Sequence, residues 1–350
     1  MPANNFLPYA PSASGLDILS QPAYAASATR TNGVSAGIAS RALYNKAQRQ
    51  ASIIAAVVAQ FIADNQPDDV IDDGTTATIL AQFEAALGNV TRINLTADTT
   101  FYVSSTGNDS TGTGAVGAPW ATITHAYNYL VNHVNLAGYT ATIQVADSGS
   151  AYAPAVMTGR PIGNGDVIIR GNPTTPANVV ITATSANAFY LVGGASAYIR
   201  GFRVTATGAN NDIGNGIYVN GAGSVALIEN ITFGACSTAW MSAASCGQVF
   251  VVGDFTGAGN TEAALRSFAG GLIYMTPVVA TFTGTPAMGL GFALARVNGN
   301  VVVDAATTFS GAVTGSRYQA TMGGAISTTT GNINFLPGNS AGSAVTGFYD

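Results

Sequence analysis

Charged residues are scarce in this chain of 350 residues. Twelve Lys and Arg and 17 Asp and Glu make up 8% of the sequence, where a globular protein carries about 25%. Lys46 is the single lysine, and the net charge is -5. Because nucleic-acid affinity depends on clustered Lys and Arg, this composition argues against a nucleic-acid partner.

Cysteines and long apolar runs are also few. Cys236 and Cys246 lack the spacing of a zinc site and the density of a disulfide scaffold, so we expect two buried thiols. His125 and His133 have no evident nucleophile or metal ligand beside them, which favours structural packing. The longest apolar stretch, residues 53–63, is shorter than the ~18 residues of a membrane span, and the first residues lack a secretory signal. We therefore expect a protein that is made in the cytoplasm and does not insert into a membrane.

The charges that are present gather near the N-terminus. Residues 1–100 hold 13 of them and the remaining 250 residues hold 16, which predicts a domain boundary near residue 95. Residues 41–65 are predicted to form a helix that belongs either to a coiled coil or to a small bundle. Its a and d heptad positions are Leu43, Ala47, Ile54, Val57 and Phe61, around a polar Gln50.

A second helix is expected over residues 75–88, with Asp73 or Thr75 as its N-cap and Gly88 at its end. The acidic residues between the helices lack the alternating pattern of a calcium loop and more simply form a solvated turn. They are Asp68, Asp69, Asp72 and Asp73. Before both helices, residues 1–37 are rich in Ala, Ser, Asn and Pro, which is typical of an extended segment that docks on another protein.

After residue 100 the chain consists of short Val, Ile, Thr and Phe runs separated by Gly, Asn and Ser, a pattern that predicts strands and turns. Phenylalanine recurs at an interval close to one turn of a β-solenoid, namely at Phe233, Phe255, Phe282, Phe309 and Phe335. Seven or eight rungs are expected over residues 139–338, with Val, Ile and Phe inside and Thr, Ser and Asn outside. Gly and Asn would supply the left-handed corners.

A second column consists of Arg170, Arg200 and Glu229, each after an apolar residue. Stacked about 4.8 Å apart on successive rungs, Arg200 and Glu229 would attract each other and the two arginines would repel. We interpret this column as a surface ladder worth under about 1 kcal/mol.

Residues 101–136 predict a strand, a glycine-rich turn and an amphipathic helix that begins near Pro119. The apolar face of this helix would carry Trp120, Ile123, Tyr127 and Leu130. Laid across the first rung, it would cap the open sheet edges of the solenoid.

The same residues resemble the beginning of the right-handed parallel β-helix proteins of the pectate-lyase superfamily. The resemblance lies in Tyr102-Val103-Ser104, Gly107-Asn108-Asp109, Gly112, Ala118-Pro119-Trp120-Ala121-Thr122-Ile123 and Ala126. Trp120 stands where phenylalanine is usual. This motif is informative about the fold and not about a reaction.

The N-terminal segment with the first helix, and the last residues NFLPGNSAGSAVTGFYD, resemble tail fibre and tailspike proteins of tailed bacteriophages. The resemblance implies a homotrimeric virion component whose N-terminal region, with Asn5, Phe6, Leu7 and Pro8, attaches to tail, adaptor or baseplate proteins. Its β-helix would project toward host surface polysaccharide or hold another fibre protein. Packing between three solenoids would also hide surface that carries no charges.

Some tailspikes cleave polysaccharides, and glycoside hydrolysis needs two carboxyl groups about 5 to 9.5 Å apart. Glu229 and Asp254 are the candidate pair, expected on consecutive rungs with an offset of two to three residues. Asp304 stacks on no acid, and Asp166, Asp212 and Glu262 stand alone. Trp240, Tyr218 and Tyr274 would stack on sugars or, more simply, pack within the fold. The sequence thus favours structure and adhesion over catalysis, with no cofactor and no metal.

The predicted organisation is therefore mainly β and trimeric, with five regions. Residues 1–37 form the docking segment, 38–95 a helical attachment and trimerisation domain, and 96–138 the first strand and capping helix. Residues 139–338 form the parallel β-helix, and 339–350 a C-terminal tail. The alternatives to a structural fibre are a polysaccharide depolymerase and an attachment hub whose residues 335–350 hold a separate receptor-binding protein.

Overall fold

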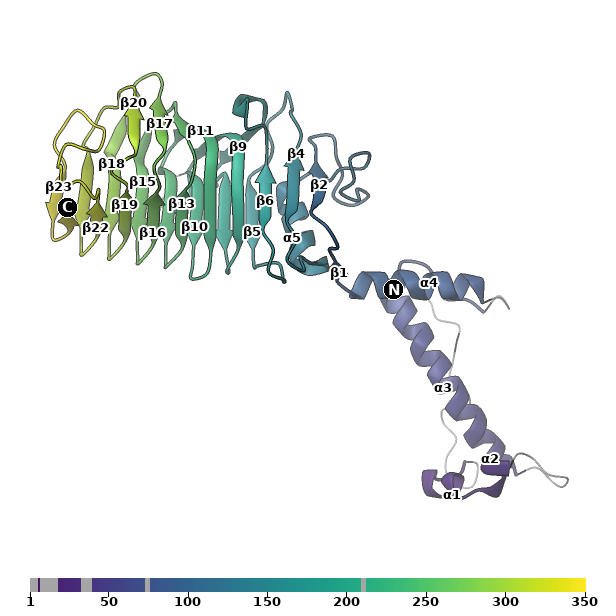
Figure 1. Cartoon of the computed structure of the whole chain (residues 1–350). Coiled ribbons are helices and arrows are strands. Elements are labelled where there is room, and N and C mark those ends of the chain that lie inside the picture. Colours follow the sequence, from purple (N-terminus) through teal and green to yellow (C-terminus); the bar gives the residue numbers. More distant parts are fainter. Residues whose placement is uncertain (1–5, 7–17, 33–39, 73–75, 209–211) are drawn as a thin grey trace. The chain divides into compact units, whose positions relative to one another are not determined.

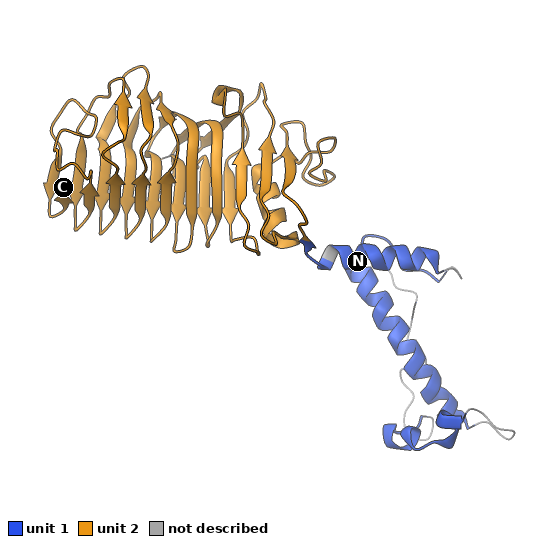
Figure 2. Cartoon of the chain, in the orientation of Figure 1, with its two compact units in different colours: residues 1–93 blue, residues 94–350 orange. Residues whose placement is uncertain are grey.

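The chain divides into two compact units, residues 1–93 and residues 94–350 (Figure 2). This computed structural model describes residues 6, 18–32, 40–72, 76–208 and 212–350. The division lies close to residue 95, where the charge distribution predicts a boundary. None of the described helices combines the length and the apolar composition that a membrane crossing requires.

The described part of unit 1 is helical. It contains α1 (Gln21–Ala25), α2 (Ala28–Asn32), α3 (Arg41–Asn65) and α4 (Ala77–Val90). Helix α3 has the predicted bounds, because the Ser40 side chain accepts a hydrogen bond from the Leu43 amide at its start and Pro67 follows its end. Helices α1 and α2 lie within residues 1–37, which we expected to be extended.

Helix α4 begins and ends two residues later than predicted. Thr76 is its N-cap, and the predicted caps Asp73 and Thr75 lie outside the described residues. Gly88 lies inside the helix instead of ending it, and the Thr91 hydroxyl donates to the Leu87 carbonyl 2.8 Å away at the end. A small core joins α3 to the rest of the unit, with Ala59, Ile62, Ala63 and Val70 at its centre and Phe6, Phe61, Ile79 and Phe83 around it.

Unit 2 is a parallel β-solenoid of about eight turns (Figure 1). An eight-stranded sheet contains β5 (Ala155–Thr158), β8 (Phe189–Val192), β10 (Asn215–Asn220), β12 (Ala239–Ala244), β15 (Thr261–Phe268), β18 (Met288–Arg296), β21 (Tyr318–Thr321) and β23 (Ser343–Val345). A fourteen-stranded sheet contains β2 (Thr99–Val103), β4 (Ala141–Val145), β6 (Val167–Arg170), β7 (Val180–Thr184), β9 (Ser196–Thr207), β11 (Val225–Cys236), β13 (Gln248–Val251), β14 (Phe255–Gly257), β16 (Leu272–Met275), β17 (Val279–Phe282), β19 (Asn300–Val303), β20 (Thr308–Ser310), β22 (Ala325–Ser327) and β24 (Phe348–Tyr349). The described residues also form β1 (Ile93–Asn94), β3 (Val134–Asn135), α5 (Ile123–His133) and a short 3-10 helix, Pro176–Asn178.

The fourteen-stranded sheet bends where β9 and β11 change direction. Gly201 has a φ of 79° and Asn230 a φ of 50°, and the strands pair on both sides of these residues. The sheet therefore forms two faces. We call the part with β4, β6, β13, β16, β19 and β22 the long face, and the part with β7, β14, β17 and β20 the short face.

The predicted phenylalanine period is confirmed inside the solenoid. Phe233 and Phe255 have ring centroids 5.9 Å apart, Phe282 and Phe309 6.3 Å, and Phe309 and Phe335 5.6 Å. Along β4 and most other strands, buried residues alternate with partly exposed ones, because successive side chains point to opposite faces. The interior of the solenoid is thus a continuous column of stacked apolar side chains.

Four successive corners between the two sheets share one geometry. Each has three residues between the strands, the first in a left-handed conformation with φ between 50° and 53° (Ser245, Ala269, Val297 and Met322). The third residue is always glycine, because a Cβ there would lie 2.3 to 2.5 Å from a carbonyl oxygen of the preceding rung. These glycines are Gly247, Gly271, Gly299 and Gly324.

Helix α5 begins at Ile123, later than the start near Pro119 that we predicted. The Asp109 carboxylate accepts hydrogen bonds from the Ala121 and Thr122 amides at 2.7 and 3.1 Å, which holds these residues outside the helix. Trp120 is buried and forms a parallel bridge with Val103. On its buried face α5 carries Ile123, Ala126, Tyr127 and Leu130.

Residues 339–350 form the last strands of the solenoid and not a separate tail. Ser343 of β23 pairs with Gln319, and Phe348 of β24 pairs with Ala325. Backbone pairing thus continues past the predicted end of the β-helix at residue 338.

Candidate interaction surfaces

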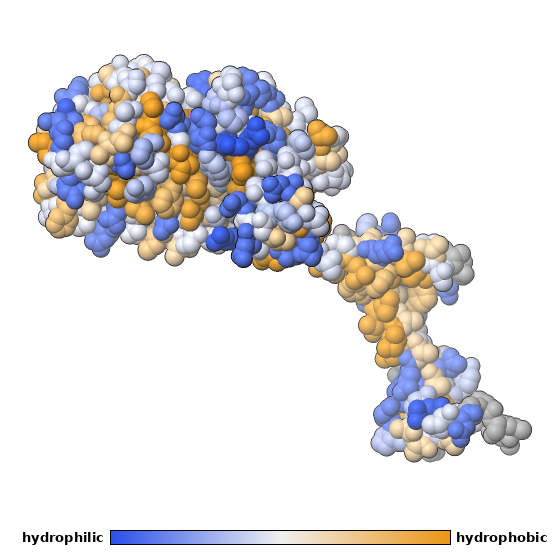
Figure 3. Space-filling view, viewed as in Figure 1, coloured by the Kyte–Doolittle hydropathy of each residue, from blue (hydrophilic) through white to orange (hydrophobic). Residues whose placement is uncertain are grey.

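Helix α3 has two apolar faces. Ala56, Ala59, Ile62 and Ala63 form the buried one. The other consists of Ile53, Ile54, Val57 and Val58, which we call the α3 seam, and it is visible as a hydrophobic patch on the helix in Figure 3. Ile54 is 65% exposed and Val57 62%. Four large apolar side chains at successive g, a, d and e positions are the pattern of a helix that packs against other helices.

The five residues predicted to lie in an oligomer interface do not all lie on the exposed face of α3. Ile54 and Val57 lie in the α3 seam, whereas Leu43 and Ala47 are partly buried. The Phe61 ring packs against Phe83 of α4, with centroids 6.1 Å apart. Of the residues predicted to attach to the virion, Phe6 packs against the small core of unit 1; Asn5, Leu7 and Pro8 lie outside the described residues.

The predicted ladder on the long face is confirmed in register: Arg170 pairs with Arg200, and Arg200 with Glu229. Arg200 Nη1 lies 3.9 Å from Glu229 Oε2, and the Tyr198 hydroxyl donates to the same carboxylate. The Asn230 side-chain amide donates to Glu229 Oε1 at 2.9 Å. The Glu229 carboxylate therefore contacts two side chains of the preceding rung and one of its own strand.

Asp254 lies on the rung after Glu229, beside an irregular point of the strand pairing. Before this point Ile228 pairs with Val251, so Glu229 faces Val252, two residues before Asp254, which is within the predicted offset. The Asn230 amide donates to the Asp254 carbonyl at 2.7 Å, and Ile231 pairs with Phe255. The left-handed Asn230 bends the strand between the two carboxylates. Asp254 Oδ1 accepts from the Val279 amide at 2.8 Å, so this carboxylate also connects two rungs.

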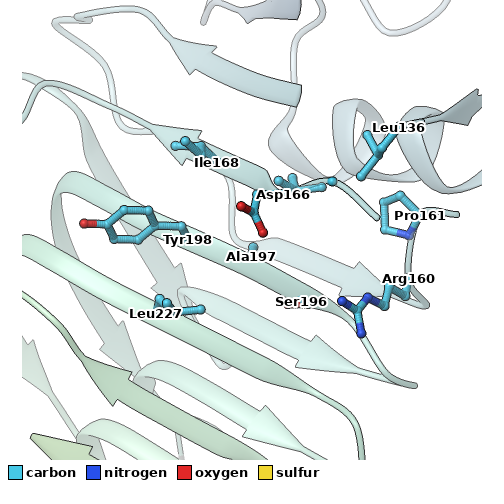
Figure 4. Close-up of a pocket in the computed structure, with 11 residues that line it drawn as sticks. Leu136, Arg160, Pro161, Asp166, Ile168, Ser196, Ala197, Tyr198 and Leu227 are labelled. Carbon is cyan, nitrogen blue, oxygen red and sulfur yellow. The ribbon is translucent and has the colours of Figure 1, made fainter. Parts of the chain in front are cut away.

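The other acids of unit 2 are scattered. Asp304 Oδ1 accepts from the Ala306 amide within its own turn, and Asp212 Oδ1 accepts from the Tyr218 hydroxyl 3.3 Å away. Asp166 lines a cavity of about 130 Å³ together with Arg160 and Tyr198 (Figure 4), which is smaller than ligand pockets usually are. Among the described residues, no three His, Cys, Asp or Glu side chains lie close enough together to hold a metal ion.

The outer surface of the eight-stranded sheet carries an aromatic ladder that the sequence did not reveal. The Tyr190 and Tyr218 rings stack at 5.3 Å, Phe268 lies parallel to Tyr218 at 6.5 Å, and the Arg266 guanidinium lies 4.2 Å from the Phe268 ring centroid. Burial raises the pKa of Tyr218 and lowers that of Arg266. Tyr190 and Tyr218 are 28 residues apart in the sequence and Tyr218 and Phe268 are 50 apart, so only the exact strand register could have placed these rings together.

Other predicted residues are placed as follows. Trp240 is buried between Phe233 and Phe282, and His133 stacks on Tyr129, which confirms packing roles. Cys236 is buried, and burial raises its pKa to about 12. Cys246 is exposed, contrary to our prediction, because it occupies the middle position of one of the three-residue corners.

Comparison of the chain with protein-family models, with curated proteins and with solved structures found no match.

Proposed function

We propose that this chain is a structural component of a bacteriophage virion, a homotrimeric tail fibre or short tailspike. Its helical unit would join three copies and attach them to tail proteins, and its β-helix would project from the particle for host adhesion. Helix α5 would cap the first rung. The observation that carries the proposal is the α3 seam, an apolar stripe on a 25-residue helix whose opposite face already packs within the chain.

Three copies explain the composition of this seam better than two. β-branched residues at both a and d positions favour trimers. In helix α3, Ile54 occupies an a position and Val57 occupies a d position. The parallel β-helix fold and the resemblance of the N-terminal segment to bacteriophage tail proteins also support a homotrimeric fibre or tailspike.

The mass of the full-length protein in solution tests the trimer. We expect about three times the chain mass of 35.2 kDa, and a stable mass of one chain would overturn the proposal. Ile54→Asp with Val57→Asp should dissociate the assembly, whereas Ala55→Asp, an exposed position beside the seam, should leave the mass unchanged.

Antibodies raised against the solenoid should label the tails of purified particles, and labelling elsewhere would contradict the virion assignment.

One observation favours an attachment hub as a second candidate. Strands β23 and β24 lie at the ends of their sheets, where Val345 is 63% and Phe348 69% exposed. An apolar strand edge of this kind is a template for pairing with another chain. Phe348→Asp should reduce the amount of a further fibre protein on the particle while the trimer mass stays the same; an unchanged complement would remove this candidate.

The depolymerase alternative stays a prediction. Release of oligosaccharide from host capsule or lipopolysaccharide, abolished by Glu229→Gln or Asp254→Asn, would establish it.

A further inference from the structure

The long face of the solenoid carries a continuous outward column of apolar side chains. Strand pairing places them in register on six successive rungs: Ile168, Tyr198, Leu227, Phe250, Tyr274 and Val302. All six are partly exposed, while their neighbours along each strand are buried. Thr142 and Ser327 continue the column at its two ends, so the apolar part, which we call the apolar column, is bounded by hydroxyl groups.

The other two faces of the solenoid differ from this one. On the short face, Thr232, Thr256, Thr281 and Ser310 stack in one outward column. The outer surface of the eight-stranded sheet carries the aromatic ladder with the Arg266 guanidinium over it. An apolar surface of this length, bordered by polar residues, is the pattern of an interaction site and not of free surface.

We propose that the solenoids of neighbouring copies of this chain pack against each other through the apolar column. This inference rests on the proposed trimer and adds the surface by which its solenoids meet. Strand spacing makes the column about 24 Å long, so it would hold the solenoids together along their length and not only through the α3 seam.

The absence of charge in the column identifies the partner. When copies are related by a rotation axis parallel to the solenoid, each residue beside the axis faces the same residue of its neighbours. A charged residue in that column would face its own charge, which is destabilising. None of the six residues of the apolar column is charged, and the charged residues Arg170, Arg200 and Glu229 stand in the adjacent column, two residues further along each strand.

The aromatic rings of the column fit protein packing better than sugar stacking. The Arg200 guanidinium lies 5.5 Å from the centroid of the Tyr198 ring, and the Tyr198 hydroxyl is engaged with Glu229. Phe250 and Tyr274 are tilted by 48° at a centroid distance of 6.3 Å, so they do not form one flat platform. The column itself would offer a glycan few hydrogen-bonding groups, since Tyr274 is the one other column residue with a hydroxyl.

Site-specific cross-linking of the full-length protein tests this inference. Cys246 is first replaced by serine because it is exposed, while the buried Cys236 can stay. Phe250→Cys is then treated with a short bismaleimide, and Thr256→Cys on the short face serves as the matched control. We expect cross-linked dimers and trimers of Phe250→Cys on a denaturing gel, at least tenfold more than for the control.

Cross-linking that is equal for the two variants, in a protein whose mass is three chains, would overturn this inference and leave the proposed function intact. A mass of one chain would overturn both. Protection of Phe250→Cys from maleimide by a host oligosaccharide, without any cross-link between copies, would assign the column to a glycan and would also overturn the inference.

Discussion

The Tyr127 hydroxyl joins helix α5 to the solenoid, and its removal is an informative single perturbation. It donates to the Gly159 carbonyl at 2.9 Å and accepts from the Ser196 amide at 3.1 Å. These partners follow β5 and begin β9, so one oxygen atom joins the helix to both sheets. Tyr127 itself is fully buried.

Tyr127→Phe keeps the ring and removes only this oxygen. A carbonyl and an amide then lose a partner, and each buried group left unsatisfied costs about 1 to 3 kcal/mol. Because water can reach some opened sites, we expect a total loss of about 2 to 4 kcal/mol of unfolding free energy at pH 7.

The same substitution should change how stability depends on pH. Burial raises the pKa of Tyr127 from 10.0 to about 12 in the folded protein. Between these values the unfolded chain loses the phenolic proton and the folded chain keeps it, so stability falls as pH rises through this window. By pH 12 this ionisation lowers the free energy of unfolding by about 2 to 3 kcal/mol. The Tyr127→Phe protein has no phenol at this position and should not show this loss.

Urea unfolding monitored by tryptophan fluorescence measures both effects, because Trp120 and Trp240 lie in unit 2. Protein concentration is held constant, and the curves are compared at pH 7 and pH 11. Tyr139→Phe, at an exposed ring, is the control and should differ little from the parent protein. A Tyr127→Phe protein as stable as this control at pH 7, or one that loses as much stability as the parent at pH 11, would refute the reasoning.

Three further predictions concern the rungs. Gly257→Ala should cost about 1 to 3 kcal/mol, because the new Cβ would lie 2.1 Å from the Trp240 ring; Gly149→Ala, with open space around it, should be near neutral, and equal urea midpoints would contradict this. Glu229→Gln should lower the free energy of unfolding by under about 1 kcal/mol, and by less at high salt, because both partners of the ion pair with Arg200 are about a quarter exposed. A larger loss that does not depend on salt would show that Glu229 stabilises the fold through something other than this ion pair. A thiol reagent at neutral pH should modify only Cys246 in the native protein and both cysteines after denaturation, and rapid native labelling of Cys236 would be inconsistent with its burial.

The parts of the fold that follow from local rules could be predicted from the sequence. Helix α3 is delimited by Ser40 and Pro67, and its bounds were predicted correctly. The register of Arg200 on Glu229 also followed, because the spacing along these rungs is nearly constant. In both cases a short-range pattern was sufficient.

The remaining features depend on contacts between rungs. Cys246 is exposed because of the three-residue corner geometry, and that geometry needs glycine at its third position only because of a carbonyl on the preceding rung. These corner glycines are 24 to 28 residues apart, and because the interval varies, the repeat of the corner could not be recognised in the sequence.

The shared corner makes the solenoid divisible into interchangeable cassettes. Residues 272–299 run from the end of one corner to the end of the next, so their removal would join Gly271 to Asn300 through a corner of the same geometry. Neighbouring strands would meet partners of the same kind, and loops elsewhere on the rung would absorb differences in length. A lineage could therefore shorten or lengthen this rod by whole turns, changing its reach while both ends keep their own surfaces.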